Sequence, residues 1–349
     1  MKKNISFYVH DISSNGGMEN MCITLANHFM AKNNVHIYTK CYGDPKFKLS
    51  NGVAIKKINN ILDLHLSLKN DNADILICVG VETVKFCLLP ALLSNVRIIS
   101  WEHFNFNTSS LLGKIWKLSS CVLVNATVVL TEKDRNNYPS FIKNKVKTIY
   151  NFLNSESEKE QYIFNSTNKK NRTKVVLAVG RLVDQKGFDL LLNSWGLLTS
   201  NDKNNFILKI VGDGDSRIDL EKKIKDNKLT NVELHPFSKN IDRYYREADL
   251  YVMSSRFEGL PMVLIEASYF GLPIVSFDCV TGPSDIIENG VNGYLVEPFN
   301  CLSMADKIKE IITDENKISL MSENSRKIYF SKFSKEKITN KWDKLVEGI

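Results

Sequence analysis

Short apolar runs alternate with longer amphipathic segments along most of the chain. Runs of five or six residues rich in Val, Ile and Leu are typical of strands that are covered on both faces. The segments between several of them have helical spacing. This alternation predicts βαβ units, which build parallel sheets covered by helices. We expect strands at 5–9, 35–39, 53–58, 74–79, 97–101, 126–130, 146–150, 174–179, 206–211, 231–236, 250–254 and 273–277.

The length of 349 residues suits two domains better than one. Residues 155–172 are rich in Ser, Glu, Asn and Lys and poor in apolar residues, which indicates a linker. The sequence therefore predicts an α/β protein with doubly wound domains at 1–154 and 173–330. Residues 331–349 carry an amphipathic pattern that predicts a terminal helix.

Two carboxylates lie eight positions apart where a predicted strand leads into a helix. Glu258 follows the strand, Pro261 suits the first helical position, and Glu266 is the one charge in the apolar helix that follows. The backbone N–H groups at such a helix start favour a phosphate, which places Gly259 and Leu260 beside a bound anion.

A second motif, Gly180-Arg181 with Gln185-Lys186-Gly187, follows an earlier strand. Arg181 and Lys186 are two cations that could reach one diphosphate. In order, spacing and residue type, the two motifs resemble the C-terminal half of the retaining GT-B glycosyltransferases of the large group 1, or family 4, type. The Gly282-Pro283-Ser284-Asp285 turn resembles members that build bacterial surface polysaccharides such as O-antigen and capsule.

The resemblance implies two Rossmann-like domains that face a central cleft, with the C-terminal helix crossing back to the first domain. It implies that Arg181 and Lys186 stabilise the leaving diphosphate, that Glu258 binds the donor sugar, and that Glu266 binds the ribose. The backbone at Phe237 and Ser238 would contact the base.

The resemblance also assigns roles in the first domain. Gly16 and Gly17 would face the donor diphosphate, and Glu19 would lie on the acceptor side. His103, which follows the strand at 97–101, would contact the donor sugar as a catalytic residue. From the sequence alone, a glycine turn and a single histidine would more often be structural features.

Asp213-Gly214-Asp215 matches the Asp-x-Asp signature with which another glycosyltransferase fold holds a metal. It lies in the middle of the second domain, where the family has an ordinary glycine turn, and Arg181 and Lys186 supply the charge that a metal would bring. We therefore expect no metal and no cofactor besides the nucleotide-sugar co-substrate.

Positive charge is concentrated in residues 1–150, which hold 18 Lys and Arg against 10 Asp and Glu. No nucleic-acid-binding motif accompanies this charge, so an anionic membrane surface is the expected partner. The stretch 109–118 combines apolar residues and Trp116 with Lys114 and Lys117. A helix that covers the sheet would explain the apolar residues at least as well, but the lysines, Trp116 and the positive charge of this half favour a helix that contacts the membrane.

The seven cysteines form no close pair, and we expect free thiols in a reducing cytoplasm. No apolar run has the roughly 20 residues that a membrane span requires. We expect a cytoplasmic protein that is peripheral on the inner face of the cytoplasmic membrane.

We expect a hexosyltransferase that moves a hexose or N-acetylhexosamine from a nucleotide sugar, most simply a UDP-sugar, to a lipid-linked saccharide of a surface polysaccharide. One alternative is a sugar-nucleotide epimerase of similar architecture, which the Arg181 and Lys186 motif disfavours. The other is a non-catalytic binding subunit, which would be expected to lack some of these residues.

Overall fold

The computed structural model describes residues 2–14, 16–41, 43, 45–103, 106, 109–153, 172–198 and 206–349. Contacts divide the chain into two compact units. The first contains residues 1–154 together with 335–349, and the second contains residues 155–334. Of the predicted linker at 155–172, all but Arg172 lies outside the described residues.

The first unit contains a seven-stranded parallel sheet in the order β3-β2-β1-β4-β5-β6-β7. Its strands are β1 (Asn4–Asp11), β2 (Asn34–Cys41), β3 (Ala54–Lys57), β4 (Ile75–Val79), β5 (Arg97–Trp101), β6 (Ala126–Val129) and β7 (Val146–Thr148). The connecting helices are α1 (Gly17–Met30), α2 (Ile61–Asn70), α3 (Val81–Leu93), α4 (Leu111–Leu123) and α5 (Glu132–Asn136). Thr131 caps α5, because its hydroxyl accepts the Asp134 N–H at 3.0 Å.

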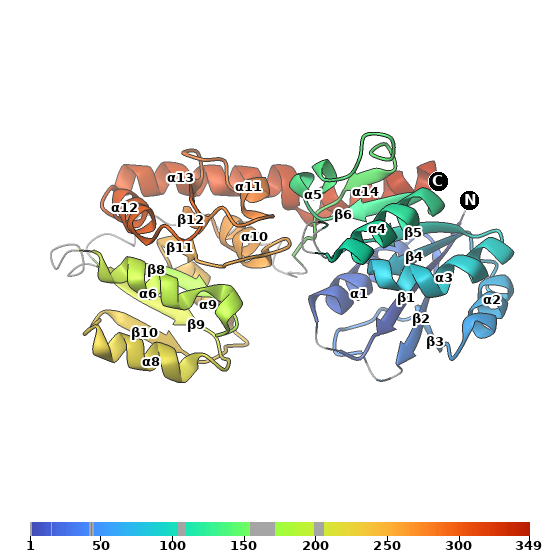
Figure 1. Ribbon diagram of the computed structural model, residues 1–349, viewed down its shortest axis with the longest axis horizontal. Coiled ribbons are helices and arrows are strands. Elements are labelled where there is room, and N and C mark those ends of the chain that lie inside the picture. The colour runs from blue at the N-terminus through green and yellow to red at the C-terminus, as the bar shows by residue number, and fades with distance from the viewer. Residues whose placement is uncertain are drawn as a thin grey trace. The chain divides into compact units, whose positions relative to one another are not determined.

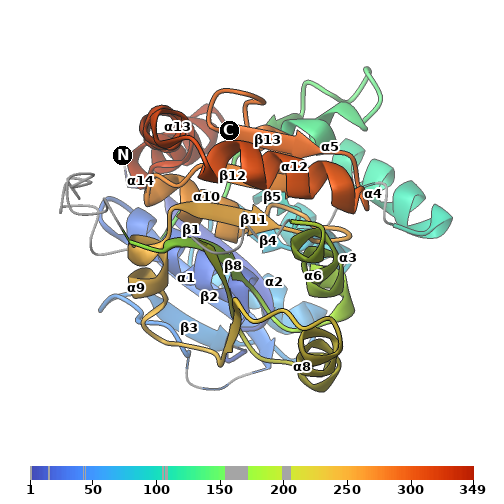
Figure 2. The same ribbon diagram turned by 90° about the vertical axis from the view of Figure 1, so that its left-hand side faces the viewer.

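The second unit contains a six-stranded parallel sheet in the order β10-β9-β8-β11-β12-β13. Its strands are β8 (Lys174–Val179), β9 (Phe206–Val211), β10 (Val232–His235), β11 (Leu250–Met253), β12 (Ile274–Phe277) and β13 (Gly293–Val296). Its α-helices are α6 (Phe188–Gly196), α8 (Arg217–Asp226), α9 (Ile241–Glu247), α10 (Met262–Tyr269), α11 (Pro283–Ile286), α12 (Cys301–Ile312) and α13 (Glu315–Ile328), as labelled in Figures 1 and 2.

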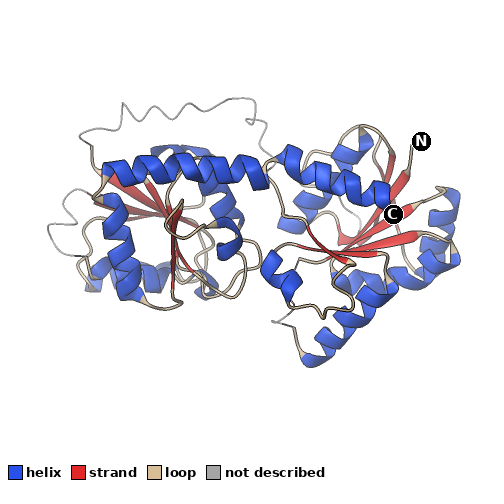
Figure 3. Ribbon diagram, turned by 90° about the horizontal axis from the view of Figure 1, so that it is seen from above, coloured by secondary structure: helices blue, strands red, loops and turns tan. Residues whose placement is uncertain are grey.

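Helices lie on both faces of each sheet (Figure 3), which explains why the strands are apolar throughout rather than alternating. In the second unit, α6 and α12 pack against each other, and their side chains share a core with β8, β9 and β12. In the first unit, α2 and α3 bury Leu64, Leu68 and Val84 against Leu76 of β4.

The predicted doubly wound architecture is confirmed. All twelve expected strands are present, and their ends differ from the prediction by at most two residues. Pro261 is the N-cap of α10 and not its first helical residue, because its backbone is extended (φ −74°, ψ 98°) and its carbonyl accepts the Leu264 N–H.

The C-terminal helix α14 (Lys335–Gly348) belongs to the first unit. Trp342 lies edge-on to Trp101 at the end of β5, with ring centroids 5.0 Å apart, and Asp343 pairs with His28 of α1 at 2.9 Å. A five-residue π-helical segment, Tyr329–Phe333, connects α13 to the residues before α14. The chain thus completes the first unit with its last residues.

All seven cysteines are free. Among the described residues, no helix combines the length and the hydropathy needed to cross a bilayer.

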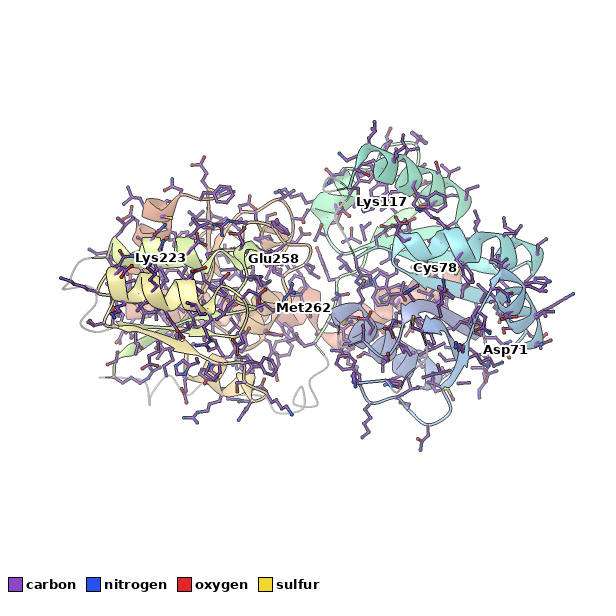
Figure 4. All side chains as sticks on the ribbon, turned by 60° about the horizontal axis from the view of Figure 1, so that its bottom comes forward. Asp71, Cys78, Lys117, Lys223, Glu258 and Met262 are labelled. Atoms are coloured by element: carbon purple, nitrogen blue, oxygen red, sulfur yellow. The ribbon has the colours of Figure 1, made fainter. Side chains whose placement is uncertain are left out.

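Lys117 differs from the expectation that it would lie on a membrane-facing surface. Lys117, which is labelled in Figure 4, is 4% exposed. Its ammonium group lies 3.5 Å from the carboxylate of Glu102, which is 2% exposed. Burial raises the pKa of Glu102 to about 7, and the charge of Lys117 opposes that rise. Lys117 therefore neutralises a buried acid, and only the other side of α4 remains for an external partner.

We predict that Lys117→Met lowers the free energy of unfolding at pH 8 by about 3 kcal/mol, because Glu102 would remain buried without its cation. The loss should be smaller at pH 5. Folding raises the pKa of Glu102, so protonation of this carboxyl group favours the folded state as the pH falls through the folded pKa. Urea unfolding at the two pH values measures both effects.

Lys114→Met is the matched control, since Lys114 lies one turn earlier on α4 and forms no ion pair with any described residue. The double variant Glu102→Gln, Lys117→Met should recover most of the loss. Equal losses at pH 5 and pH 8 would show that the effect is one of packing and not of charge.

Candidate functional site

The strand order reverses direction between β1 and β4 in the first sheet and between β8 and β11 in the second. At such a switch point the connections leave toward opposite faces, and the carboxyl ends of the two strands border a ligand crevice. The loop from Gly180 to Gly187 follows β8, and the loop from Ser254 to Pro261 follows β11. The structure thus places both motifs of the second unit at its switch point.

The two loops are tied together by Arg256, which the sequence analysis did not identify. Its guanidinium binds both carboxylate oxygens of Asp189 at 2.8 Å and the Asp184 carbonyl at 2.7 Å. The backbone N–H of Arg256 donates to the Gln185 carbonyl at 2.8 Å. Because its donors are used within the protein, Arg256 holds the loops in place and is not a free cation.

Gly187 lets the same loops approach closely. Its φ of +62° is left-handed, and a Cβ at this position would overlap the Ser254 carbonyl oxygen. The Ser254 hydroxyl donates to the Lys186 carbonyl at 3.0 Å. The backbone of Lys186 is therefore held by a residue of the loop that follows β11.

Lys186 and Glu258 form an ion pair across the two loops. The Lys186 ammonium lies 2.6 Å from Oε1 of Glu258, and the Ser255 hydroxyl donates to the same oxygen at 2.7 Å (Figure 4 labels Glu258). Oε2 of Glu258 accepts no hydrogen bond from the described residues. A lysine ammonium has three N–H donors, so it can bind phosphate oxygens while it holds Glu258.

Arg181 is exposed and forms no ion pair with any described residue, in contrast to Arg256. It follows Gly180 at the end of β8. Arg181 lies in the same loop as Lys186, and the loop that follows β11 leads into the N-terminus of α10. An exposed guanidinium in this position is suited to a phosphate-bearing ligand.

Glu266 lies in α10, where its Oε2 accepts the hydroxyl of Tyr245 at 2.6 Å. Its side chain is partly exposed, yet protein atoms surround the carboxyl group, and this desolvation raises the pKa of Glu266. The Tyr245 ring stacks on Phe270. Tyr245 thus positions Glu266, a contact that no spacing in the sequence indicates.

Phe237 and Ser238 follow β10. Phe237 is 70% exposed, and the Ser238 hydroxyl accepts the Asn240 N–H at 3.2 Å. Their predicted contact with the base of a nucleotide stays a prediction. Asp213 of the Asp-x-Asp sequence pairs with Arg217 at 3.2 Å. Gly212 and Gly214 have positive φ and approach the Gly180 and Leu182 carbonyls, so this turn supports the β8 loop.

In the first unit, Gly16 is the N-cap of α1 and Gly17 is its first residue. Glu19 is buried in the first turn, and its carboxylate lies where a Cβ on Gly16 would be. This is the geometry of an acidic residue at a helix start. Contacts of Gly16 and Gly17 with donor and of Glu19 with acceptor stay predictions.

His103 lies two residues beyond the end of β5, with its ring 4.8 Å from that of Trp101. Burial lowers its pKa to about 3, so the imidazole is neutral at pH 7. Its buried Nε2 has no hydrogen-bond partner among the described residues. Such a nitrogen can bind a ligand hydroxyl, and the predicted contact with the donor sugar stays a prediction.

Comparison with known proteins finds a family profile, related sequences and similar solved structures. The sequence profile described as "Glycosyl transferases group 1" matches residues 159–328. The chain is 33% identical to the amylovoran biosynthesis glycosyltransferase AmsD of Erwinia amylovora, with 88% of this chain and 89% of AmsD covered.

A second relative is the GalNAc-alpha-(1->4)-GalNAc-alpha-(1->3)-diNAcBac-PP-undecaprenol alpha-1,4-N-acetyl-D-galactosaminyltransferase of Campylobacter jejuni, with 28% identity over 99% of this chain and 98% of the relative. The solved structure of Anabaena HepE in complex with UDP matches with a TM-score of 0.82 and 17% identity, covering 99% of this chain and 100% of that chain. At this identity, the structural likeness shows the fold.

The order of both sheets, the loops at the second switch point and the similarity over the length of AmsD lead to one conclusion. The chain is an enzyme with the GT-B fold, a hexosyltransferase that belongs to the group 1 glycosyl transferases.

Proposed function

We propose that this enzyme transfers a hexose or N-acetylhexosamine from a UDP-sugar to a lipid-linked saccharide with retention of anomeric configuration. The polysaccharide would be a bacterial surface polymer such as O-antigen, capsule or exopolysaccharide. The observation that carries the proposal is the set of unused groups at the second switch point. Arg181 is unpaired among the described residues, and Glu258 keeps one carboxylate oxygen free.

The relatives support the choice of donor and acceptor. HepE was solved with UDP. The name of the Campylobacter jejuni relative describes a saccharide that is linked to undecaprenol through a diphosphate. AmsD is named for amylovoran biosynthesis. A UDP-linked donor and a lipid-linked acceptor are therefore the substrates that we propose for this chain.

The proposed chemistry depends on charge stabilisation. As the bond between the anomeric carbon and the diphosphate breaks, its electron pair goes to the leaving oxygen, where Arg181, Lys186 and the N–H groups of Gly259 and Leu260 would stabilise it. The acceptor hydroxyl attacks from the same face and gives its proton to the leaving phosphate. Retention then needs no separate base.

The two glutamates would hold different parts of the donor. Glu258, fixed by Lys186 and Ser255, would accept a sugar hydroxyl at its free Oε2. Glu266, fixed by Tyr245, would accept the ribose hydroxyls. Because Asp213 is already paired with Arg217, we propose that the diphosphate is bound without a metal.

We also propose that the enzyme lies on the cytoplasmic face of the membrane, where the start of α4 contacts anionic lipid. Leu111, Leu112 and Ile115 are 76%, 79% and 53% exposed, whereas Trp116 is partly buried and donates to the Val81 carbonyl at 3.3 Å. Apolar residues exposed on a basic unit are typical of reversible interfacial binding.

The first test of function is a thermal-shift screen of nucleotide sugars, followed by an assay of UDP release with the donor that stabilises the enzyme. We predict that Arg181→Ala lowers turnover by about tenfold to a thousandfold, as expected for loss of a donor to the leaving group, and leaves stability unchanged. Arg256→Ala is the contrasting variant and should lower stability, since its ion pair with Asp189 joins the loops.

The same assay in excess EDTA tests the metal-free proposal. Activity in EDTA is the expected result, whereas loss of activity in EDTA with recovery in Mn²⁺ would indicate that Asp213 and Asp215 bind a metal.

Parent-like turnover of Arg181→Ala would overturn the assignment of the leaving-group site.

For the membrane surface, we predict that the parent co-sediments with vesicles containing phosphatidylglycerol and that added salt weakens the association. Leu111→Ser, Leu112→Ser should reduce the sedimented fraction several-fold, because it removes the apolar contact. The matched control is Leu302→Ser, Leu320→Ser, since both of these leucines are 61% exposed on the second unit. If both double variants sediment like the parent, α4 is not the contact.

A further inference from the structure

A concave pocket of about 570 Å³ lies in the first unit beside β7, the last strand of its sheet. It is bordered by α5 and by the C-terminal helix α14. This volume is in the range that small-molecule sites occupy. No residue assigned to donor, acceptor or membrane contributes to its lining, so the pocket is separate from the proposed activity.

The lining is strongly basic. It contains Arg135, Lys145, Lys147, Lys341 and Lys344. Among the described residues of the lining, Glu132 is the one with a carboxylate side chain; it lies 3.5 Å from Arg135 and also attracts the charge of Lys341. The positive charge therefore exceeds what the pocket itself neutralises.

Two of these cations are used within the protein. Arg135 donates to the Val146 carbonyl at 3.0 Å. The Lys145 ammonium donates to the Val122 and Val124 carbonyls at 2.7 Å and 3.0 Å, where α4 ends. Lys147 and Lys344 remain exposed, and neither forms an ion pair with a described residue.

Lys341, which lies on α14, is likewise exposed and forms no ion pair with a described residue. Its ammonium lies 5.3 Å from the centroid of the Tyr150 ring. Although much of its side chain is exposed, neighbouring protein atoms partly desolvate the ammonium and lower the pKa of Lys341. A bound anion would offset that desolvation.

The pocket also offers an apolar wall, because Ile149 and Leu345 contribute to its lining. A ligand that carries both an anionic group and a carbon portion would use all of these features.

We propose that this pocket binds a phosphate monoester, with the phosphate between Lys147, Lys341 and Lys344 and the carbon portion against Leu345. A phosphate monoester carries up to two negative charges and three acceptor oxygens, which matches several ammonium groups around one pocket better than a single carboxylate does. The ester can come from a lipid headgroup or from a soluble metabolite.

Isothermal titration calorimetry of the full chain, with excess UDP present to occupy a donor site, tests the proposal. The probes are dihexanoyl phosphatidate below its micelle concentration, glycerol 3-phosphate, and dihexanoyl phosphatidylcholine as a probe without a monoester. We expect saturable 1:1 binding of at least one monoester, and we expect Lys341→Gln, Lys344→Gln to weaken it by tenfold or more.

Two controls separate the pocket from general charge and from the membrane surface. Lys337→Gln removes an exposed lysine from the same helix outside the pocket lining, and Leu111→Ser, Leu112→Ser alters the start of α4. Both should bind the monoester like the parent. Thermal unfolding of each variant confirms that it is folded.

Tighter binding of the phosphatidate than of glycerol 3-phosphate would support the site and assign a lipid source. Equal binding of the two would support the site and assign a soluble ester. The proposal is overturned if neither monoester binds saturably, if phosphatidylcholine binds as tightly, or if the folded Lys341→Gln, Lys344→Gln variant binds like the parent.

Discussion

The ion pair between Lys186 and Glu258 is the interaction on which the candidate donor site depends. It joins loops that follow two neighbouring strands, β8 and β11, at the point where the strand order of the second sheet reverses. Parallel strands bring the two residues together although 72 positions separate them in the chain. The pair is largely buried, so each charge requires the other, and removal of one partner would leave an uncompensated charge.

Some cations at the candidate donor site bind protein groups, and others remain available for a ligand. The Arg256 guanidinium binds the Asp189 carboxylate and the Asp184 carbonyl, and these contacts fix the two loops. Arg181 has no such partner among the described residues, and Lys186 is held by one oxygen of Glu258. An anion site that is positioned before the ligand arrives loses little free energy to reorganisation, and that is the property required to stabilise a leaving diphosphate.

The sequence predicted the strands and the position of the site because both depend on local signals. Buried parallel strands are continuous apolar runs, and the motifs around Arg181 and Glu258 directly follow such strands. Contacts between distant segments carry no such signal. The pairing of Arg256 with Asp189, the support of Glu266 by Tyr245, and the burial of Lys117 against Glu102 become visible only when helices and loops are placed in space. Lys117 looked like a surface residue because lysine is rarely buried without a partner, and that partner could not be identified from spacing.

A double-mutant cycle on Lys186 and Glu258 tests the central claim most directly. Initial rates of sugar transfer would be measured for Lys186→Met, Glu258→Gln and the double variant, with urea unfolding to confirm that each is folded. If the pair works as one unit, each single variant loses at least about tenfold in rate, and the double variant loses far less than the product of the two losses. Losses that multiply independently, or single variants with parent-like rates, would contradict the account.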